Sequence, residues 1–307
     1  MSRAALLAQI RHFFAERGVL EVDPPVLASA SVTDINIDSI VATVAGQNCY
    51  LQTSPEFFMK RMLASGSGDI YSLGRAFRDA EQGPRHNPEF TLLEWYRSGW
   101  DDFQLMTEVE VLISELFHTQ HQAQLPVSRL SYADCFAEVF DIDPHSCALS
   151  QLQKLAAEYG SQSWRNESRA NCLDLLFSTR VEPQLPEGLV LVYHYPACQA
   201  ALSQIESQDQ GYSVSRRFEV FLNRVELANG YLELTDADQQ QQRFEADNVE
   251  RVAAQRNAMP IDKNLDSAMR AGLPPCAGVA LGVDRLLMQL QGVSSIDRVL
   301  PFAWQRC

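Results

Sequence analysis

The sequence predicts an α+β fold in which an antiparallel sheet is flanked by helices. Predicted strands outnumber the helices that could connect parallel strands, and hairpin-like loops join neighbouring strands. With 307 residues and 46% hydrophobic content, the chain can also bury a large core. We expect one domain over residues 1–307, with short helical patterns over 125–188 forming an insertion within it.

The elements follow from hydrophobic periodicity and from residues that start or stop helices. Apolar residues at helical spacing predict amphipathic helices over 3–17 and 101–120. Pro24 and Pro25 exclude helix, whereas Ser54 followed by Pro55 predicts an N-cap and a first helical residue. Strands are predicted over 70–80, 85–96 and 189–196, and as a pair over 215–236. The other predicted elements are helices over 131–140, 149–159, 169–180 and 236–257, and a strand, a glycine turn and a helix over 277–290.

Charge and composition narrow the classes of function. The net charge is −14, from 25 basic and 39 acidic residues, and no basic run is present, which disfavours a nucleic-acid partner such as tRNA. No apolar stretch is long enough for a membrane span, and the N-terminal helix is too charged for a signal peptide. The seven cysteines form no C-x-x-C pair, so we expect buried, reduced thiols in a cytosolic protein.

The predicted strand RHNPEFTLLEWY, residues 85–96, has an unusual face. Side chains alternate along a strand, so Phe90, Leu92, Glu94 and Tyr96 share one side. Taken alone, this mixture is typical of an edge strand with a half-solvated face. A functional interpretation becomes stronger once similar side chains are found on other predicted strands.

Several of these strands carry arginines or carboxylates. Carboxylates are ligands for Mg²⁺, and arginines bind phosphate oxygens in pairs of hydrogen bonds, so the set indicates a site for a polyanion and a metal. The usual glycine-rich phosphate loops are absent, so a nucleotide would be held by arginines and a sheet surface. The residues in this set are Arg75, Arg78, Arg85, His86, Glu219, Glu226, Asn229, Tyr231, Glu233 and Arg285.

Five candidate residues have simpler alternatives. Glu56, just after Pro55, could only stabilise a helix N-terminus, and Arg285 could only cap its helix. His86 could be an ordinary loop histidine. Glu219 and Glu226 could form ion pairs with neighbouring arginines instead of binding metal. Those arginines are Arg216, Arg217 and Arg224.

Three stretches in order resemble the class II aminoacyl-tRNA synthetase core, specifically that of the lysyl-tRNA synthetases. FFAERGVLEVDPPVL is similar to motif 1, GRAFRD…RHNPEFTLLEWY to motif 2, and GVALGVDR to motif 3. TSPEFFMKR and VELANGYLELTDADQQQQRF are similar to the lysine subgroup between these motifs. The resemblance covers nearly the whole chain except the predicted insertion, and it implies a homodimer formed through motif 1.

The resemblance implies roles in binding ATP. Arg78 would bind the α-phosphate, and Arg285 would lie over adenine and the γ-phosphate. Arg85 and His86 would contact the outer phosphates, and Phe90 would stack on adenine. Where relatives often read R-x-E in motif 2, this chain has Ala80, so Glu81 or the backbone would contact adenine instead.

It also implies a metal site and an amino-acid site. Glu219 and Glu226 would hold Mg²⁺, and Asn229 would help to place the substrate carboxylate. A ring of carboxylates suits a diamine and would repel aspartate or glutamate. The residues expected to contact the two amino groups are Glu56, Glu94 and Glu233, with Tyr96 near the distal one. The amino acid would be activated as an adenylate and then transferred to a second nucleophile.

Two departures from the tRNA enzymes point to a narrower group. The predicted catalytic helix begins within a few residues of Met1, which leaves no room for the usual anticodon-binding domain. The chain therefore resembles the elongation factor P lysine ligases, which implies (R)-β-lysine or lysine as substrate and a lysine ε-amine of elongation factor P as acceptor. Motif 3 reads Gly278, Ala280, Gly282, and we expect the methyl group of Ala280 to favour β-lysine over α-lysine.

Three other functions remain open on the sequence. The chain could aminoacylate RNA without an anticodon domain, but its acidic charge disfavours this. A non-catalytic regulatory paralogue would have no chemical need for Arg78, Glu219, Glu226 and Arg285 together. A ligase that uses ammonia, like the asparagine synthetases of this fold, is disfavoured by the acidic amino-acid site.

Overall fold

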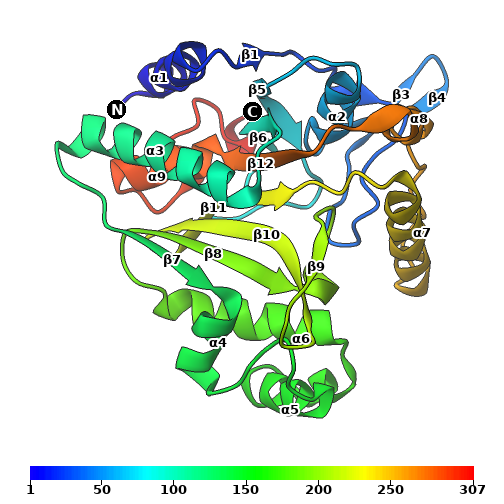
Figure 1. Cartoon of the computed structure of the whole chain (residues 1–307). Coiled ribbons are helices and arrows are strands. Elements are labelled where there is room, and N and C mark those ends of the chain that lie inside the picture. Colours follow the sequence, from blue (N-terminus) through cyan, green and yellow to red (C-terminus); the bar gives the residue numbers. More distant parts are fainter. The chain divides into compact units, whose positions relative to one another are not determined.

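The computed structural model describes all residues, 1–307, and the chain forms two compact units (Figure 1). Unit 1 comprises residues 1–122 and 233–307, and unit 2 comprises residues 123–232. The mixture of helices and mainly antiparallel strands confirms the predicted α+β class. None of the helices combines the length and the apolar character needed to cross a lipid bilayer.

Unit 1 is built on a four-stranded sheet in the order β1-β5-β6-β12. β6 pairs antiparallel with both β5 and β12, and β1 pairs parallel with β5. A smaller antiparallel sheet has the order β2-β4-β3. The strands are β1 (Leu20–Glu21), β2 (Leu27–Ala28), β3 (Val41–Val44), β4 (Gln47–Leu51), β5 (Ile70–Phe77), β6 (Glu89–Ser98) and β12 (Cys276–Gly282).

Helices cover this sheet because each presents an apolar stripe. In the first helix Leu6, Ile10, Phe13 and Phe14 are buried, and Ser2 caps its N-terminus by accepting from the backbone N–H of Ala5. Contacts join α3 to β12 and α9 to β6. The helices are α1 (Arg3–Glu16), α2 (Glu56–Ala64), α3 (Asp102–His121), α7 (Ala237–Ala253), α8 (Lys263–Gly272) and α9 (Val283–Gln291), with short 3₁₀ turns at η5 (Ile296–Arg298) and η6 (Trp304–Arg306).

Unit 2 has a sheet in the order β11-β10-β8-β7, with β9 paired to β10. β7 runs parallel to β8, and the other pairs are antiparallel. Its strands are β7 (Val127–Ser131), β8 (Leu189–Pro196), β9 (Ile205–Ser207), β10 (Ser213–Leu222) and β11 (Val225–Leu232). Its helical elements are α4 (Tyr132–Phe140), α5 (Leu149–Tyr159), η1 (Gln162–Asn166), α6 (Arg169–Leu176), η2 (Phe177–Val181), η3 (Glu182–Gln184) and η4 (Ala197–Gln199).

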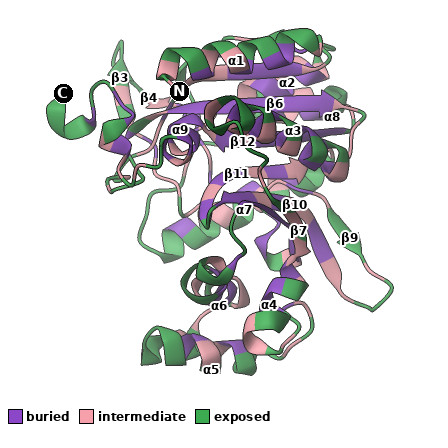
Figure 2. Ribbon diagram, turned by 90° about the vertical axis from the view of Figure 1, so that its left-hand side faces the viewer, coloured by how far each residue is buried: buried purple, intermediate pink, exposed green.

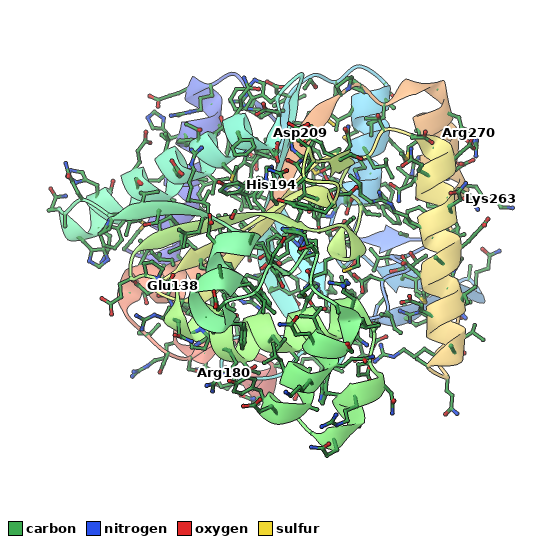
Figure 3. All side chains as sticks on the ribbon, turned by 60° about the horizontal axis from the view of Figure 1, so that its bottom comes forward. Glu138, Arg180, His194, Asp209, Lys263 and Arg270 are labelled. Carbon is green, nitrogen blue, oxygen red and sulfur yellow. The ribbon has the colours of Figure 1, made fainter.

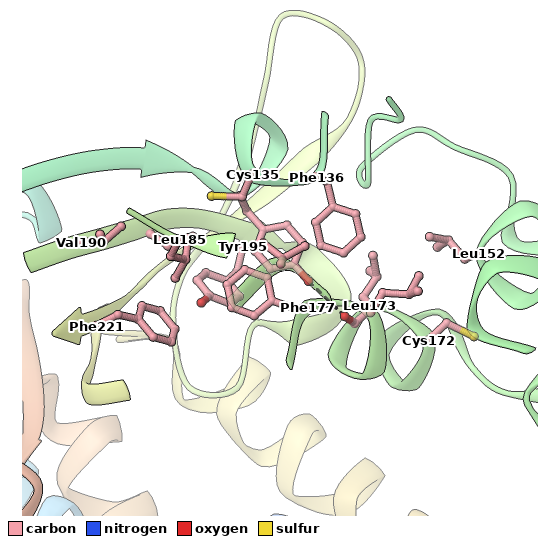
Figure 4. Close-up of a cluster of buried hydrophobic side chains, with 14 of the residues drawn as sticks. Cys135, Phe136, Leu152, Cys172, Leu173, Phe177, Leu185, Val190, Tyr195 and Phe221 are labelled. Carbon is pink, nitrogen blue, oxygen red and sulfur yellow. Dashed lines mark hydrogen bonds between the residues drawn. The ribbon is translucent and has the colours of Figure 1, made fainter. Parts of the chain in front are cut away.

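An aromatic core joins the helices of unit 2 to its sheet (Figure 4). Tyr132 of α4 stacks on Phe136 and on Phe177, with ring centroids 4.9 and 5.0 Å apart. Tyr195 of β8 and Phe221 of β10 complete the cluster from the sheet. The helices over 125–188 are therefore packed against β8 and against β10, the strand that carries Glu219.

Most predicted elements are confirmed, and four details differ. The α2 helix begins at Glu56 with Pro55 as its N-cap residue, because the Ser54 hydroxyl reaches only the Glu56 N–H, at 3.4 Å. β12 runs directly into α9 at Gly282, without a separate glycine turn. The segment 125–188 contains strand β7 besides its helices, and α8 was not predicted.

Only some of the cysteines are buried. All seven are free thiols, and Cys135, Cys172 and Cys276 are buried as expected. Cys198 and Cys307 are exposed, which makes the expectation of burial wrong for these two. Cys307 is the last residue of the chain, and Cys198 lies in the short η4 turn.

Candidate active site

Strand β6 forms the floor of the candidate site in unit 1. It lies between β5 and β12, and most of it is buried (Figure 2). Its predicted alternation is confirmed, and Glu94 and Tyr96 are 2% and 3% exposed. Tyr96 Oη donates a hydrogen bond to Glu94 Oε1 at 2.8 Å. The other carboxyl oxygen, Glu94 Oε2, is buried and has no hydrogen-bond partner.

Three carboxylates converge on this floor. Glu56 is the first residue of α2, and Glu233 follows β11 and donates its N–H to Cys276 O at 3.0 Å. Lys60 lies between them, since its Nζ is 2.6 Å from Glu56 Oε1 and 2.7 Å from Glu233 Oε2. The structure thus brings together Glu56, Glu94 and Glu233, as the sequence predicted, and adds a lysine that was not predicted.

Burial and mutual repulsion perturb these groups. Burial raises the pKa of the Glu94 carboxyl to about 8, and repulsion from Glu56 and Glu233 adds to the effect. Burial raises the pKa of Glu233 to about 7, although attraction to Lys60 opposes it. For Lys60, burial would lower the pKa, but Glu233 and Glu56 outweigh burial and raise it. Lys60 is therefore an ammonium ion at neutral pH, and the site favours a further cation.

Gly278 is required by the packing of this floor. It lies opposite Tyr96 in the pairing of β12 with β6. A Cβ atom at this position would lie 2.3 Å from Tyr96 Cε1 and 2.5 Å from Glu233 Oε1, both far inside van der Waals contact. The absence of a side chain at Gly278 thus lets the tyrosine ring and the carboxyl group approach the sheet. Ala280, two residues further on, lies opposite Glu94.

The loop between β5 and β6 carries the predicted phosphate-binding arginine. Arg78 follows β5, and its guanidinium lies 5.2 Å from the centre of the Phe90 ring. Arg78 Nη1 is 3.3 Å from Glu81 Oε1, and Arg78 Nε is buried without a hydrogen-bond partner. Ala80 has a positive φ of 58°, which turns the loop at this point. Arg78, Phe90 and Glu81 are therefore brought together as the sequence predicted.

A second arginine approaches the same loop from α9. Arg285 Nη2 lies 2.7 Å from His86 Nε2, and Arg285 Nε donates to Arg85 O at 3.4 Å. Because arginine can only donate, His86 Nε2 accepts and carries no proton in this arrangement. Arg285, Arg85 and His86, which were all expected at the outer phosphates of ATP, therefore lie together. No contact of the Arg85 side chain assigns it a role.

Asp284 is a buried residue of the site region that the sequence analysis missed. Its Oδ1 is 2.5 Å from Arg3 Nη1, and its Oδ2 accepts from the Thr91 N–H at 2.7 Å. It thereby joins α1, β6 and α9 next to Arg285. Its only signal in the sequence is an aspartate in the first turn of a helix, which is common and not specific.

Unit 2 carries the predicted metal-binding carboxylates. Glu219 lies opposite Asn229 in the pairing of β10 with β11, and burial raises its pKa to about 7, with repulsion from Glu226 adding to it. Arg217 Nη2 lies 2.5 Å from Glu219 Oε1, and Tyr195 Oη donates to Glu219 Oε2 at 2.7 Å. The alternative of an ion pair with a neighbouring arginine is therefore realised for Glu219.

Asn229 lies in the same hydrogen-bond network of unit 2. Asn229 accepts from Arg217 Nε at 3.2 Å and donates to Tyr231 Oη at 2.9 Å. No group of three or more acidic, histidine or cysteine side chains forms a metal cluster in the chain. Glu226 is near enough to Glu219 for its charge to raise the pKa of Glu219, and carboxylate oxygens are the ligands that Mg²⁺ prefers.

Comparison with known proteins defines the class. Residues 1–306 match the family described as tRNA synthetases class II (D, K and N), and the chain belongs to this family. It is 46% identical over 315 residues to proteins named elongation factor P–(R)-β-lysine ligase from Salmonella paratyphi B, Salmonella schwarzengrund and Salmonella typhi. These alignments cover 100% of this chain and 95% of each relative. The resemblance read from the three motifs is confirmed.

Proposed function

We propose that this protein activates (R)-β-lysine with ATP and transfers it to a lysine ε-amine of elongation factor P. The identity of 46% over the full chain to ligases of that name supports the substrate and the acceptor. Membership of the synthetase family supports adenylate chemistry. Because the acceptor is a translation factor, we propose that the protein acts in the cytoplasm.

One observation carries the proposed amino-acid specificity. Glu94 Oε2 is a buried carboxyl oxygen without a partner, and Glu56 and Glu233 lie in the same acidic cluster. An unsatisfied buried acceptor is costly, so an ammonium group that bonds to it gains both a hydrogen bond and a charge partner. A substrate with two amino groups satisfies such a cluster, whereas a second carboxylate would be repelled.

In the proposed first step, a carboxylate oxygen of the amino acid attacks the α-phosphorus of ATP. The bond from that phosphorus to the bridging oxygen breaks, and pyrophosphate leaves with the electron pair. Arg78 would stabilise negative charge on the α-phosphoryl oxygens, and Arg285 would hold the outer end of the nucleotide. Phe90, beside Arg78, would provide the surface for adenine. No covalent bond to the protein is required.

In the proposed second step, the ε-amine of the acceptor attacks the acyl carbon of the adenylate. The bond from that carbon to the phosphate oxygen breaks, AMP leaves, and the nitrogen loses a proton to give an amide. The buried Lys60 does not compete for the acyl group, because an ammonium ion has no lone pair with which to attack.

Mg²⁺ is the proposed metal, and Glu219 and Glu226 are its proposed protein ligands. When bound, the ion would neutralise charge on the phosphate oxygens and orient them for in-line displacement. Glu219 keeps its ion pair with Arg217 in this proposal, and Arg217 in turn holds Asn229.

We also propose that the protein is a homodimer. The motif 1 segment exposes three apolar side chains, with Leu20 57% exposed and Val26 and Leu27 each 42% exposed. Exposed apolar groups clustered in one segment are typical of protein interfaces.

Amino-acid-dependent exchange of labelled pyrophosphate into ATP tests the activation step. We expect exchange with (R)-β-lysine, weaker exchange with L-α-lysine, and none with aspartate. Glu94→Gln should raise the KM for the amino acid at least tenfold and leave the KM for ATP within about twofold. Exchange that is equally strong with aspartate would contradict the proposal.

A further inference from the structure

The contacts of Lys60 point to a role that neither the motifs nor the names of the relatives assign. The chain contains three lysines, and the other two, Lys154 and Lys263, are exposed. Lys60 is 1% exposed, although lysine is among the residues least often buried. Its ammonium group bridges Glu56 and Glu233, two of the three proposed contacts for the substrate's amino groups.

We propose that Lys60 is a positioning residue that acts as a fixed internal ammonium ion in the amino-acid site. It favours the ionised form of Glu233 and holds the carboxyl groups of Glu56 and Glu233 at a set separation. This inference rests on the proposed function, because it concerns how the same site selects a substrate with two amino groups.

The first argument is the balance of charge. Three carboxylates, Glu56, Glu94 and Glu233, meet at the floor of the site, and burial raises the pKa of the latter two. Buried carboxylates that share a site cannot all ionise unless cations compensate them. Once the substrate's ammonium group ionises Glu94, Lys60 compensates one of the three carboxylates, which leaves two for the substrate. The protein thus matches the two ammonium groups of a diamino acid.

The second argument is geometric. Because a single Nζ contacts one oxygen of Glu56 and one oxygen of Glu233, those two oxygens must lie close together. Glu56 begins α2 and Glu233 follows β11, so no backbone pairing between these two residues sets that spacing. Lys60 is one turn beyond Glu56 in α2, which directs both side chains to the same helix face. The lysine therefore links the two proposed contacts for amino groups.

The third argument is that Lys60 forms ion pairs with Glu56 and Glu233 but not with Glu94. The charge of Lys60 lowers the pKa of Glu94 slightly. The hydrogen bond to Glu94 comes from Tyr96, and Glu94 Oε2 has no partner. The other titratable group that faces Lys60 is Cys276, whose burial raises its pKa to about 12 and keeps it neutral. Glu94 is thus the carboxyl group most available to the incoming substrate.

Lys60→Met tests the inference, because it removes the charge and keeps a long unbranched side chain. Attraction to Lys60 holds the pKa of Glu233 down against burial, so without Lys60 this pKa rises and Glu233 becomes protonated near neutral pH. At a pH below the raised pKa, each further unit of increase lowers the ionised fraction of Glu233 about tenfold. We expect the KM for (R)-β-lysine in pyrophosphate exchange at pH 7 to rise at least tenfold, with the KM for ATP unchanged. The increase should shrink as the pH is raised to 9.

Two further variants make the test specific. Lys263→Met removes a lysine that is exposed at the start of α8, on the outside of unit 1 (Figure 3), and should leave both KM values unchanged. Lys60→Arg keeps a permanent positive charge, so it should keep the wild-type dependence of KM on pH. If Lys60→Met does not fold, Lys60→Arg is the test. A dependence of its KM on pH that differs from that of the wild-type protein would overturn the inference.

The outcomes also separate this inference from the proposed function. If the wild-type protein shows no exchange with either isomer of lysine, the proposed function fails. If the wild-type protein shows exchange, and Lys60→Met has an unchanged KM or the same increase at every pH, only the role of Lys60 is wrong. A purely structural role would lower kcat and raise the KM for ATP as well.

Discussion

Ala280 lies directly opposite Glu94 in the pairing of β12 with β6. Residues paired in this way point to the same face of the sheet, with Cβ atoms about 5 Å apart. The methyl group of Ala280 therefore borders the carboxyl group that we propose binds an amino group of the substrate. We predict that Ala280→Gly lowers the ratio of kcat/KM for (R)-β-lysine to that for L-α-lysine by about tenfold.

The control for Ala280→Gly is Ala277→Gly on the same strand. Ala277 is buried and lies opposite Arg97, so its methyl group points to the other face. Ala277→Gly should lower stability by about 1 kcal/mol and leave the preference between isomers unchanged. An unaltered preference in Ala280→Gly would show that the methyl group does not select the isomer.

Gly278→Ala should damage the amino-acid site without affecting nucleotide binding. The added Cβ would overlap the ring of Tyr96 and the carboxyl group of Glu233. Displacing these buried groups costs about 1–3 kcal/mol, so we expect the KM for the amino acid to rise about tenfold or more. Gly74→Ala is the matched control, because a Cβ there meets only Ser72 Oγ, at 3.8 Å. Equal effects of the two variants in pyrophosphate exchange would contradict this assignment.

The pKa of Glu94 predicts that amino-acid binding releases protons. In the ligand-free protein this pKa is about 8, against an ordinary value of 4.5. A bound ammonium group favours the ionised carboxylate, so binding at pH 7 should release a proton to the buffer. Calorimetric titrations in buffers of different ionisation enthalpy would measure this release. Glu94→Gln should reduce it, and no release from the wild-type protein would refute the prediction.

The same shift predicts how stability depends on pH. Between pH 4.5 and about 8 the folded protein retains a proton on Glu94 that the unfolded chain loses. The folded state then binds more protons, so the free energy of unfolding falls as pH rises through this range. Thermal unfolding would be measured at pH 6 and at pH 8.5. The fall in the melting temperature between these two pH values should be smaller in Glu94→Gln than in the wild-type protein.

The proposed metal site predicts a change in the requirement for Mg²⁺. Glu226→Gln should raise the Mg²⁺ concentration that gives half-maximal exchange about tenfold, because one of two proposed carboxylate ligands is lost. Glu206→Gln in unit 2, where Glu206 pairs with Arg216 on β10, is the control. If Glu226→Gln has the Mg²⁺ dependence of the wild-type protein, Glu226 is not a ligand.

Asp284→Ala should destabilise the protein. Asp284 is 2% exposed and joins Arg3 and the backbone of Thr91. Removing one partner of a buried ion pair costs about 3 kcal/mol, which denaturant unfolding would detect. Arg3→Ala should cost less, because Arg3 is more exposed. A larger loss of stability in Arg3→Ala than in Asp284→Ala would mean that Asp284 is not the centre of this network.

The sequence predicted the parts of the site that follow from strand alternation and motif order. The face of β6 that carries Phe90, Glu94 and Tyr96 followed directly from the period of two. Lys60 was missed because a lysine in a helix is normally solvated, and its burial depends on Glu233, which is far away in the sequence. Likewise, nothing local indicates that a Cβ at Gly278 would meet Tyr96.

The fold was predictable to a similar extent. β8 matches the predicted span, because LVLVYHYP is a short run of mostly apolar and aromatic residues. β7 was missed because the sequence VSRLS is short and half exposed, and only its pairing with β8 makes it a strand. The ion pair of Glu219 with Arg217 was named as an alternative, but residue types could not decide between it and metal binding.

Transfer of labelled (R)-β-lysine tests the central claim most directly. The purified protein would be given Mg-ATP, the labelled amino acid, total tRNA and unmodified elongation factor P in one tube. We predict label on elongation factor P that resists RNase, and less label when α-lysine replaces β-lysine. Label that RNase removes would contradict the claim and identify the protein as an enzyme that aminoacylates RNA.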